Sequence, residues 1–339
     1  MRQITYAEAI REAFAQVLAS DERVVVIGQG VTNPWYVGDS MRDLDKHFGP
    51  SRLIDPPVSE QGMNGLAIGA ALAGLRPILI HPRMDFLLKG FEQVVNQAAN
   101  WCYIFGGQAS VPLTIRAIIN RGGEQGAQHS QALQALFAHI PGLKVVMPAT
   151  PYDAKGLLIA SVQDGNPVVY IDDRWLYKEM GEVPEEPYTV PIGKGAVRKD
   201  GDHVTLVAIS YMVIEAHKAL SLLGEEGIDA ELIDMRSVKP WDKELIISSV
   251  RKTGRLVVAD SGWRSGGVAA EILACIAEEA WDALKAPPAR VAPPPHPLPP
   301  APWRQPTTLV LNTSWTQSSA SAPTCTNEGR PRELESALC

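Results

Sequence analysis

Glu60 is a carboxylate placed where it could take part in proton transfer. It follows Ser59 at the start of residues 59–74 (SEQGMNGLAIGAALAG), a helix-like segment rich in glycine and alanine. From these residues alone a structural role is the default interpretation, because a serine N-cap followed by an acid in the first turn stabilises a helix. The glycines run through the helix instead of forming a strand-to-helix turn, so they do not make a dinucleotide-binding fingerprint. They predict a subunit contact or tight packing on a sheet.

His129 and Phe86 are the other two side chains whose positions suggest chemistry. His129 lies in residues 122–131 (GGEQGAQHSQ), a polar loop predicted to follow a strand. A loop histidine is either a candidate acid or base, since imidazole exchanges a proton near neutral pH, or a residue held by neighbouring backbone groups. Phe86 follows another predicted strand, where a ring either packs in the core or stacks on a planar ligand.

The sequence has no motif that binds a diphosphate together with its metal ion. A P-loop, a GxGxxG turn, a GxSxG elbow and a GDG motif with a downstream Asn are all absent, and the seven histidines lack metal-ligand spacing. If the chain uses a phosphorylated cofactor, another chain must hold the phosphates.

Composition narrows the class of protein. The chain has 339 residues, 45% of them hydrophobic, and this length predicts two domains because single cores stop growing near ~250–300 residues. A net charge of −7 argues against a nucleic-acid or anionic-membrane partner. No apolar stretch reaches the ~18 residues of a membrane span. The four cysteines form no CxxC pair, so we expect reduced thiols in a cytoplasmic protein.

Apolar strands alternate with helical patterns through the first half of the chain. Strands are predicted at residues 23–28, 76–80, 111–118, 143–147 and 167–171, and helices at residues 64–73 and 86–103. Continuous apolar strands between helices predict an α/β domain with a parallel sheet covered on both faces. We place this first domain at residues 1–177.

A second, smaller parallel-sheet domain is predicted after a break in pattern. Residues 178–200 contain prolines and acids without periodicity, which predicts a linker. Strands and helices then alternate again over residues 201–292. Residues 293–339 are rich in Pro, Ser and Thr, and this composition predicts a poorly ordered tail.

Five long segments carry a family resemblance: IDPPVSEQGMNGLAIGAALAGLRPI, FEQVVNQAANWCYIFGGQASVPLTIR, AQHSQALQALFAHIPGLKVVMPATPYDAKGLL, DGNPVVYIDD and IDMRSVKPWDKELIISSVRKTGRLVVADSGWRSGGVAAEI. In this order they resemble the β subunit of the first, decarboxylating component of 2-oxoacid dehydrogenase complexes, of the pyruvate dehydrogenase kind. The resemblance covers residues 3–292. It implies a transketolase-type pyrimidine-binding domain followed by a transketolase C-terminal domain.

The resemblance also implies roles for single residues. Glu60 would hydrogen-bond N1′ of the aminopyrimidine of thiamine diphosphate and share a proton with it, and Phe86 would stack on that ring. Met84 and Gln29 would complete the cofactor contacts. His129 would orient the substrate or donate a proton at the mouth of the site.

Other components follow from the same resemblance. An α subunit would hold the magnesium ion and the cofactor phosphates, in an assembly of two α and two β chains, and a lipoyl acyltransferase core protein would accept the acyl group. A potassium ion held by backbone carbonyls is a further option, at Leu113, Ser161, Asp164 and Asn166.

The implied reaction is oxidative decarboxylation of a 2-oxoacid such as pyruvate, with acyl transfer to lipoamide. An acetoin or branched-chain 2-oxoacid dehydrogenase β subunit and a non-catalytic paralogue are the alternatives. Gln29-Gly30 stands where many relatives carry an acidic pair, and residues 80–83 (IHPR) replace the more usual acidic and aromatic residues. These departures point to a different substrate or to lost turnover, whereas the retained Glu60, Phe86 and His129 favour a catalytic subunit.

Overall fold

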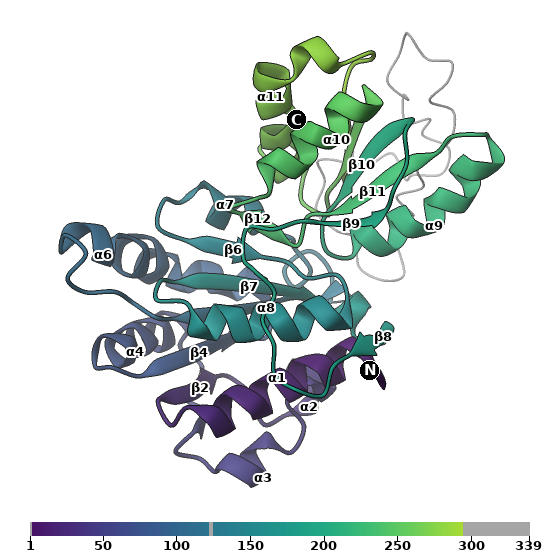
Figure 1. Ribbon diagram of the computed structural model, residues 1–339. Coiled ribbons are helices and arrows are strands. Elements are labelled where there is room, and N and C mark those ends of the chain that lie inside the picture. Colours follow the sequence, from purple (N-terminus) through teal and green to yellow (C-terminus); the bar gives the residue numbers. More distant parts are fainter. Residues whose placement is uncertain (1, 122–124, 294–339) are drawn as a thin grey trace, which may run out of the picture.

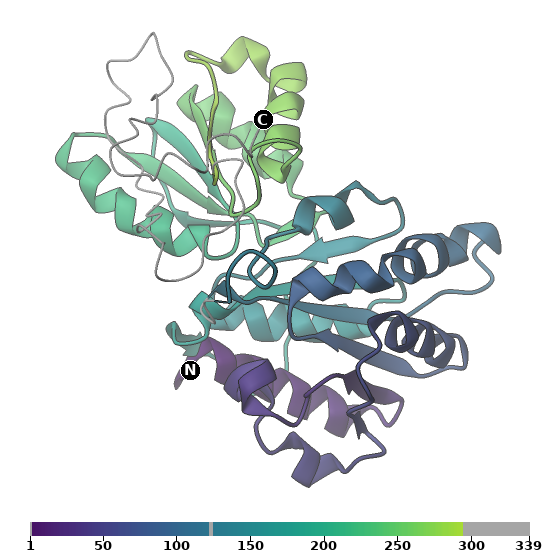
Figure 2. The same ribbon diagram turned by 180° about the vertical axis from the view of Figure 1, so that it is seen from behind.

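Two α/β sheets organise the chain, which a computed structural model describes over residues 2–121 and 125–293 (Figure 1). The first sheet has seven strands and the second has five. Seen from the two opposite sides, the C-terminal domain sits above one end of the larger domain (Figures 1 and 2). Within the described residues, no helix combines the length and apolar content needed to cross a membrane. All of the predicted tail beyond residue 293 lies outside the described residues.

The first sheet confirms the predicted α/β class. Its strand order is β12-β6-β7-β5-β4-β2-β3, and every pairing is parallel except that of β12 with β6. The strands are β2 (Val24–Gly28), β3 (Leu53–Ile54), β4 (Arg76–His81), β5 (Thr114–Ile119), β6 (Lys144–Val146), β7 (Val168–Asp173) and β12 (Ser237–Lys239). Strand β12 comes from the second half of the chain, so the first sheet is completed by a segment beyond the predicted domain boundary.

Both faces of this sheet are buried, which explains why its strands read as continuous apolar runs. Successive residues of β4 point to opposite faces of the sheet and pack in different hydrophobic cores. Ile78 packs with helices α1 and α8, and Leu79 packs with helix α4. The helices of this domain are α1 (Tyr6–Ser20), α2 (Pro34–Val37), α3 (Leu44–Phe48), α4 (Glu60–Leu72), α7 (Gln134–His139) and α8 (Pro151–Gln163).

The single long helix predicted at residues 86–103 is wrong. The segment consists of α5 (Met84–Leu87), a 3₁₀ turn, a π-helical turn at Gln93–Ala98 and α6 (Ala99–Ile104). Gly90 passes so close to α4 that a Cβ at this position would overlap the side-chain amide of Asn64. The chain therefore changes its winding where it crosses the helix that carries Glu60, and changes of this kind are common near functional sites.

Residues 178–200, predicted as a linker, contain two strands. β8 (Met180–Val183) pairs antiparallel with β1 (Arg2–Thr5), and β9 (Ala196–Lys199) pairs antiparallel with the edge of the second sheet. Both strands lie at edges and are largely exposed, so they lack the apolar alternation that marks a buried strand.

The second sheet forms the core of the C-terminal domain, with strand order β14-β13-β10-β11-β9. The pairings among β10, β11, β13 and β14 are parallel, as predicted. Its strands and helices are β10 (Val204–Ala208), α9 (Met212–Glu225), β11 (Ala230–Asp234), α10 (Lys243–Thr253), β13 (Leu256–Ala259), α11 (Val268–Glu279) and β14 (Ala289–Val291).

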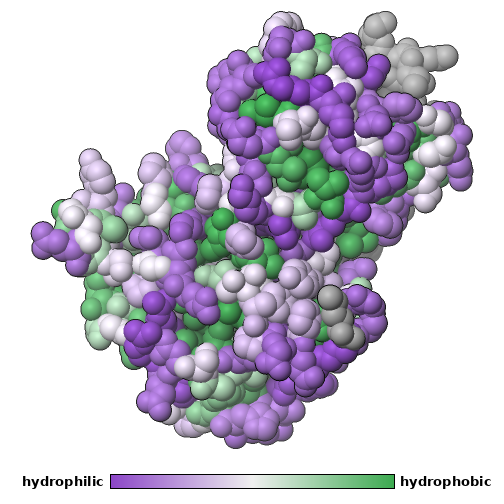
Figure 3. Space-filling model, in the orientation of Figure 1, coloured by the Kyte–Doolittle hydropathy of each residue, from purple (hydrophilic) through white to green (hydrophobic). Residues whose placement is uncertain are grey.

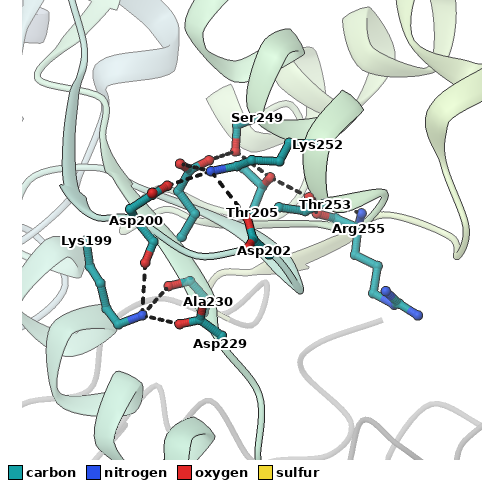
Figure 4. Close-up of polar contacts among 11 residues, drawn as sticks. Lys199, Asp200, Asp202, Thr205, Asp229, Ala230, Ser249, Lys252, Thr253 and Arg255 are labelled. Carbon is teal, nitrogen blue, oxygen red and sulfur yellow. Dashed lines mark hydrogen bonds and ion pairs between the residues drawn. The ribbon is translucent and has the colours of Figure 1, made fainter.

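A polar cluster joins α10 to the start of this sheet (Figure 4). Lys252 on α10 lies 2.7 Å from the Glu231 carboxylate and 2.6 Å from that of Asp200. Thr205 on β10 is 2.6 Å from the Ser249 hydroxyl and 2.8 Å from that of Thr253. Since buried hydroxyls must find partners, this network accounts for polar side chains beneath the sheet and needs no ligand.

Ion pairs connect the two domains. Asp153 on α8 is fully buried, and it accepts a hydrogen bond of 2.9 Å from Arg236 and another from Arg198 on β9. Arg198 also lies 2.7 Å from Asp234, whose pKa rises to about 6 because the carboxylate is desolvated. Removing one member of such a set leaves buried charge uncompensated, so the network fixes how the domains sit together.

Candidate functional site

The pocket of interest opens at the carboxyl ends of β2 and β4, where open parallel sheets bind their ligands. It has a volume of about 200 Å³. Its walls come from the turn after β2, the first turn of α4, the segment from the end of β4 into α5, and the loop after β5. The lining residues are Gln29, Trp35, Tyr36, Glu60, Met63, His81, Pro82, Arg83, Phe86, Gln125 and His129.

Glu60 is 7% exposed and stands in the first turn of α4. Ser59 caps this helix, its hydroxyl accepting a hydrogen bond of 3.3 Å from the Gly62 amide, so the predicted capping role of Ser59 is confirmed. The Glu60 carboxylate also lines the pocket, with Lys89 as its nearest cation at 3.9 Å. Glu60 therefore both occupies the first turn of α4 and faces the pocket.

Asn64 ties Glu60 to the end of β4. Its side-chain amide donates to the Glu60 carbonyl at 2.7 Å and lies 3.1 Å from Nε2 of His81. Because the Asn64 nitrogen is the donor, Nε2 of His81 accepts, and the imidazole is neutral. Burial agrees with this assignment, since desolvation lowers the pKa of His81 to about 3.

Phe86 and His129 meet at the pocket although they are far apart in the sequence. Their ring centroids are 5.1 Å apart and their planes nearly perpendicular, at 89°. Both side chains are half-buried, which leaves part of each ring accessible from the pocket. Nδ1 of His129 is buried without a hydrogen-bond partner among the described residues. An aromatic wall beside an unpaired imidazole nitrogen is suited to a planar, polar ligand.

Asp85 supports this wall from behind. One oxygen of its buried carboxylate accepts hydrogen bonds from the side chain of Gln131 at 2.8 Å and from its backbone amide at 3.3 Å. Burial raises the pKa of Asp85. The contact holds the loop that carries His129 against α5. Sequence reasoning missed this role, because nothing local to Asp85 indicates which loop it will meet.

The other two predicted cofactor contacts, Gln29 and Met84, differ in position: Gln29 lines the pocket and Met84 does not. Gln29 lines the pocket, directly before Gly30, whose φ of +66° and hydrogen bond of 2.8 Å to Asp55 form a tight turn. Met84 is fully buried and packs in the core beneath α4. Because it lies behind the wall, Met84 reaches a ligand only through its neighbours.

Of the candidate potassium positions, Asp164 has a carbonyl group that already accepts a hydrogen bond from Arg76. Its guanidinium donates to the carbonyl oxygens of Val162 at 2.7 Å and Asp164 at 3.2 Å. The Leu113 carbonyl accepts from Val168 at 2.9 Å, and the Ser161 carbonyl accepts from Asp164 at 3.3 Å. These hydrogen bonds occupy one acceptor position on each of the three carbonyl groups, and a potassium site here stays a prediction.

The lining of the pocket suits a planar ring that can share a proton with a carboxylate. It offers the Glu60 carboxylate and aromatic walls that include Phe86 and Trp35. Its volume of about 200 Å³ lies below the ~300–1,000 Å³ typical of a complete ligand site. No group of three or more His, Cys, Asp or Glu side chains in the described part of the chain could hold a metal ion.

Two domain families match the chain. "Transketolase, pyrimidine binding domain" matches residues 2–179 and "Transketolase, C-terminal domain" matches residues 193–311. The matches agree with the two sheets, and the second extends beyond the described residues.

Comparisons with individual proteins agree with these two domain matches. The chain is 41% identical to the β subunit of acetoin:2,6-dichlorophenolindophenol oxidoreductase from Bacillus subtilis, over 88% of this chain and 91% of the relative. It is 40% identical to the β subunit of the pyruvate dehydrogenase E1 component from Rickettsia felis, over 84% and 87%. A solved structure described as a split-gene transketolase, inactive β4 tetramer, superposes with a TM-score of 0.69 at 26% identity, covering 85% and 89%.

The buried neutral His81 predicts a pH dependence of stability. Its pKa is lowered to about 3 from the ordinary histidine value of 6.5, so its contribution to stability is complete above pH 6.5 and is lost as the pH falls. Between about pH 7.5 and about pH 5 this group should remove about 2 kcal/mol from the free energy of unfolding. We expect urea denaturation of His81→Gln to lack this loss.

The comparison between variant and parent isolates His81 from the other titrating groups. Asp173 and Asp234, whose pKa values burial raises to about 6, act in the opposite direction but are common to both proteins. His217→Gln, at an exposed position on α9, should keep the parental pH dependence. The same loss on acidification in His81→Gln and the parent would show that His81 is not held neutral.

Proposed function

The chain belongs to the transketolase-like family of β subunits of thiamine-diphosphate-dependent 2-oxoacid dehydrogenases, and from this premise we propose that its pocket forms the pyrimidine half of a shared active site. The observation that carries the proposal is the position of Glu60, a nearly buried carboxylate in the wall of a small pocket that Phe86 and His129 also line. The chain contributes an acid and a ring-binding surface, while the phosphate half must come from elsewhere.

Each residue has a task that its surroundings support. When bound, thiamine diphosphate supplies the carbon nucleophile and the electron sink that decarboxylation requires. Glu60 would hold a proton at N1′ of the aminopyrimidine, and the capped first turn of α4 keeps its carboxylate in place. Phe86 would present its ring to the pyrimidine. His129, whose Nδ1 has no hydrogen-bond partner in the part of the chain that the structure describes, would orient the substrate carbonyl or move a proton to it.

The substrate and partners we propose are those of the pyruvate branch. Pyruvate would be decarboxylated and the acyl group passed to lipoamide on an acyltransferase core protein. An α chain would hold magnesium and the diphosphate, in an assembly of two α and two β chains. Two observations support dependence on α: the pocket is small, and a structurally similar split-gene transketolase is described as an inactive β4 tetramer.

An acetoin-cleaving β subunit is the second candidate, because the acetoin and pyruvate relatives are equally similar to the chain. A non-catalytic paralogue is the third. The departures from the family pattern at Gln29-Gly30 and at residues 80–83 suggest this candidate. Gln29 and His81, which belong to these departures, line the pocket together with Glu60.

Glu60→Gln separates a catalytic subunit from a paralogue without turnover. The amide keeps the volume of the side chain but cannot exchange a proton at N1′, so kcat should fall about 100-fold or more in the complex with α. Steady-state decarboxylation with an artificial electron acceptor measures this. Glu225→Gln, on exposed helix α9, should leave kcat unchanged. Normal turnover by the Glu60 variant would remove the basis of the proposed role.

The exposed side of α4 is the surface we propose for the α chain. Gly65 and Gly69 lie on it with nothing within 4 Å of an added Cβ, and Leu66 between them is 53% exposed. Ile104 at the end of α6 is 63% exposed. Hydrophobic surface lies among hydrophilic atoms on the side of the molecule that carries α4 and α6 (Figure 3). A small-residue helix face lets a partner backbone approach closely.

Gly69→Leu tests this placement. The added side chain meets open space in this chain, so the isolated protein should fold normally, but a closely packed α chain should be displaced. We expect weaker αβ assembly in size-exclusion chromatography with light scattering. Gly224→Leu on α9 also meets open space and is the matched control. Assembly of the Gly69 variant at parental affinity would place the α chain on another face.

A further inference from the structure

Arg83 places a guanidinium in the pocket wall, and within residues 2–121 and 125–293 no carboxylate pairs with it. The residue is 5% exposed and lines the same pocket as Glu60 and His129. Across the described residues, no Asp or Glu oxygen lies within 4.0 Å of its nitrogens. Asp85 is two residues away in sequence, but its hydrogen bonds go to Gln131. A buried cation without a paired anion is costly, and such groups are normally paired.

Neutral groups hold Arg83 in place. Its Nε donates to the Gln125 side chain at 2.8 Å, and its Nη1 donates to the carbonyl of Pro82 at 3.0 Å. The guanidinium carbon lies 5.0 Å from the centroid of the Trp35 ring and 5.9 Å from that of Tyr36. Nη2 makes no hydrogen bond to any part of the chain that the structure describes. These contacts orient the guanidinium but leave its charge available to the pocket.

A second cation strengthens the positive potential at this corner. Arg174 donates to the Tyr36 carbonyl at 2.6 Å, and Arg83 reaches the same oxygen at 3.4 Å. Burial, followed by repulsion from Arg174, lowers the pKa of Arg83 to about 10, so it remains protonated at neutral pH. Two arginines therefore converge on Tyr36, and an anion entering the pocket would relieve their repulsion.

We propose that Arg83 recognises the carboxylate of the substrate and thereby selects 2-oxoacids over neutral ketones such as acetoin. An arginine fork binds a carboxylate through charge-assisted hydrogen bonds, whereas acetoin offers it no charge. Because Arg83 and His129 line one pocket, a carboxylate bound at Arg83 would bring the adjacent 2-oxo group to the site in which His129 acts, while Glu60 meets the aminopyrimidine. The inference rests on the proposed function and decides between its pyruvate-like and acetoin-like forms.

Arg83→Gln tests the assignment in the assembled complex with α, thiamine diphosphate and magnesium. We expect kcat/KM for the preferred 2-oxoacid to fall about 10- to 100-fold, mainly through KM, because a charged hydrogen-bond partner is lost. Turnover of acetoin should not fall, so the ratio of the two specificity constants should drop by the same factor. Arg83→Lys keeps the charge and should restore part of the loss.

Arg52→Gln is the matched control. Arg52 is also held by backbone carbonyls, those of Val24 and Leu18, but it lies outside the pocket. Its loss should leave the substrate ratio unchanged. Calorimetric titration with oxamate, an unreactive isostere of pyruvate, supplies a readout apart from turnover, and Arg83→Gln should weaken oxamate binding by the same 10- to 100-fold.

Three results would overturn the inference. An unchanged ratio and unchanged oxamate affinity in Arg83→Gln would show that Arg83 does not meet the substrate carboxylate. An equal loss on both substrates with weaker binding of thiamine diphosphate would assign Arg83 to the cofactor. A parental enzyme that prefers acetoin would leave the charge without the proposed role. Absence of turnover on every substrate would instead contradict the proposed function, while the oxamate titration would still report on Arg83.

Discussion

Parallel strands that end at one edge of a sheet are the constraint on which this site depends. β2 and β4 run side by side in register, so Gly28 and Ile80 are paired, and the residues that follow both strands emerge together. Helix α4 begins at the same edge, with Glu60 in its first turn. The Asn64 amide then joins the Glu60 carbonyl to His81 at the end of β4. Because three elements meet through one buried amide, the position of the Glu60 carboxylate follows from the sheet.

The pocket carries an acidic side chain and a basic side chain at different parts of its wall. Glu60 provides the acid on the α4 side, with Lys89 at 3.9 Å, whereas Arg83 provides a positive corner held by neutral groups. His81, which also lines the pocket, is neutral, since desolvation lowers its pKa to about 3. This arrangement suits a site that handles a proton at one end and an anion at the other.

The sequence was sufficient to predict the two α/β domains, and the family resemblance identified Glu60, Phe86 and His129, which the structure brings to one pocket. Met84 was predicted as a contact but lies behind the pocket wall, because the turn into α5 directs it into the core. Strands β8, β9 and β12 escaped prediction since edge strands show little apolar alternation. The break at Gly90 and the contact of Arg83 with Trp35 depend on how distant segments cross, which local patterns do not record.

The shared-site account is tested most directly by titrating thiamine diphosphate and magnesium into this chain alone, into the α chain alone and into their mixture, with 2-oxoacid decarboxylation measured on the same samples. The account predicts weak cofactor binding and no turnover for either chain alone, and tight magnesium-dependent binding with turnover for the mixture. Tight magnesium-dependent binding by this chain alone would contradict it, because the pocket would then have to hold the diphosphate that its geometry leaves to a partner.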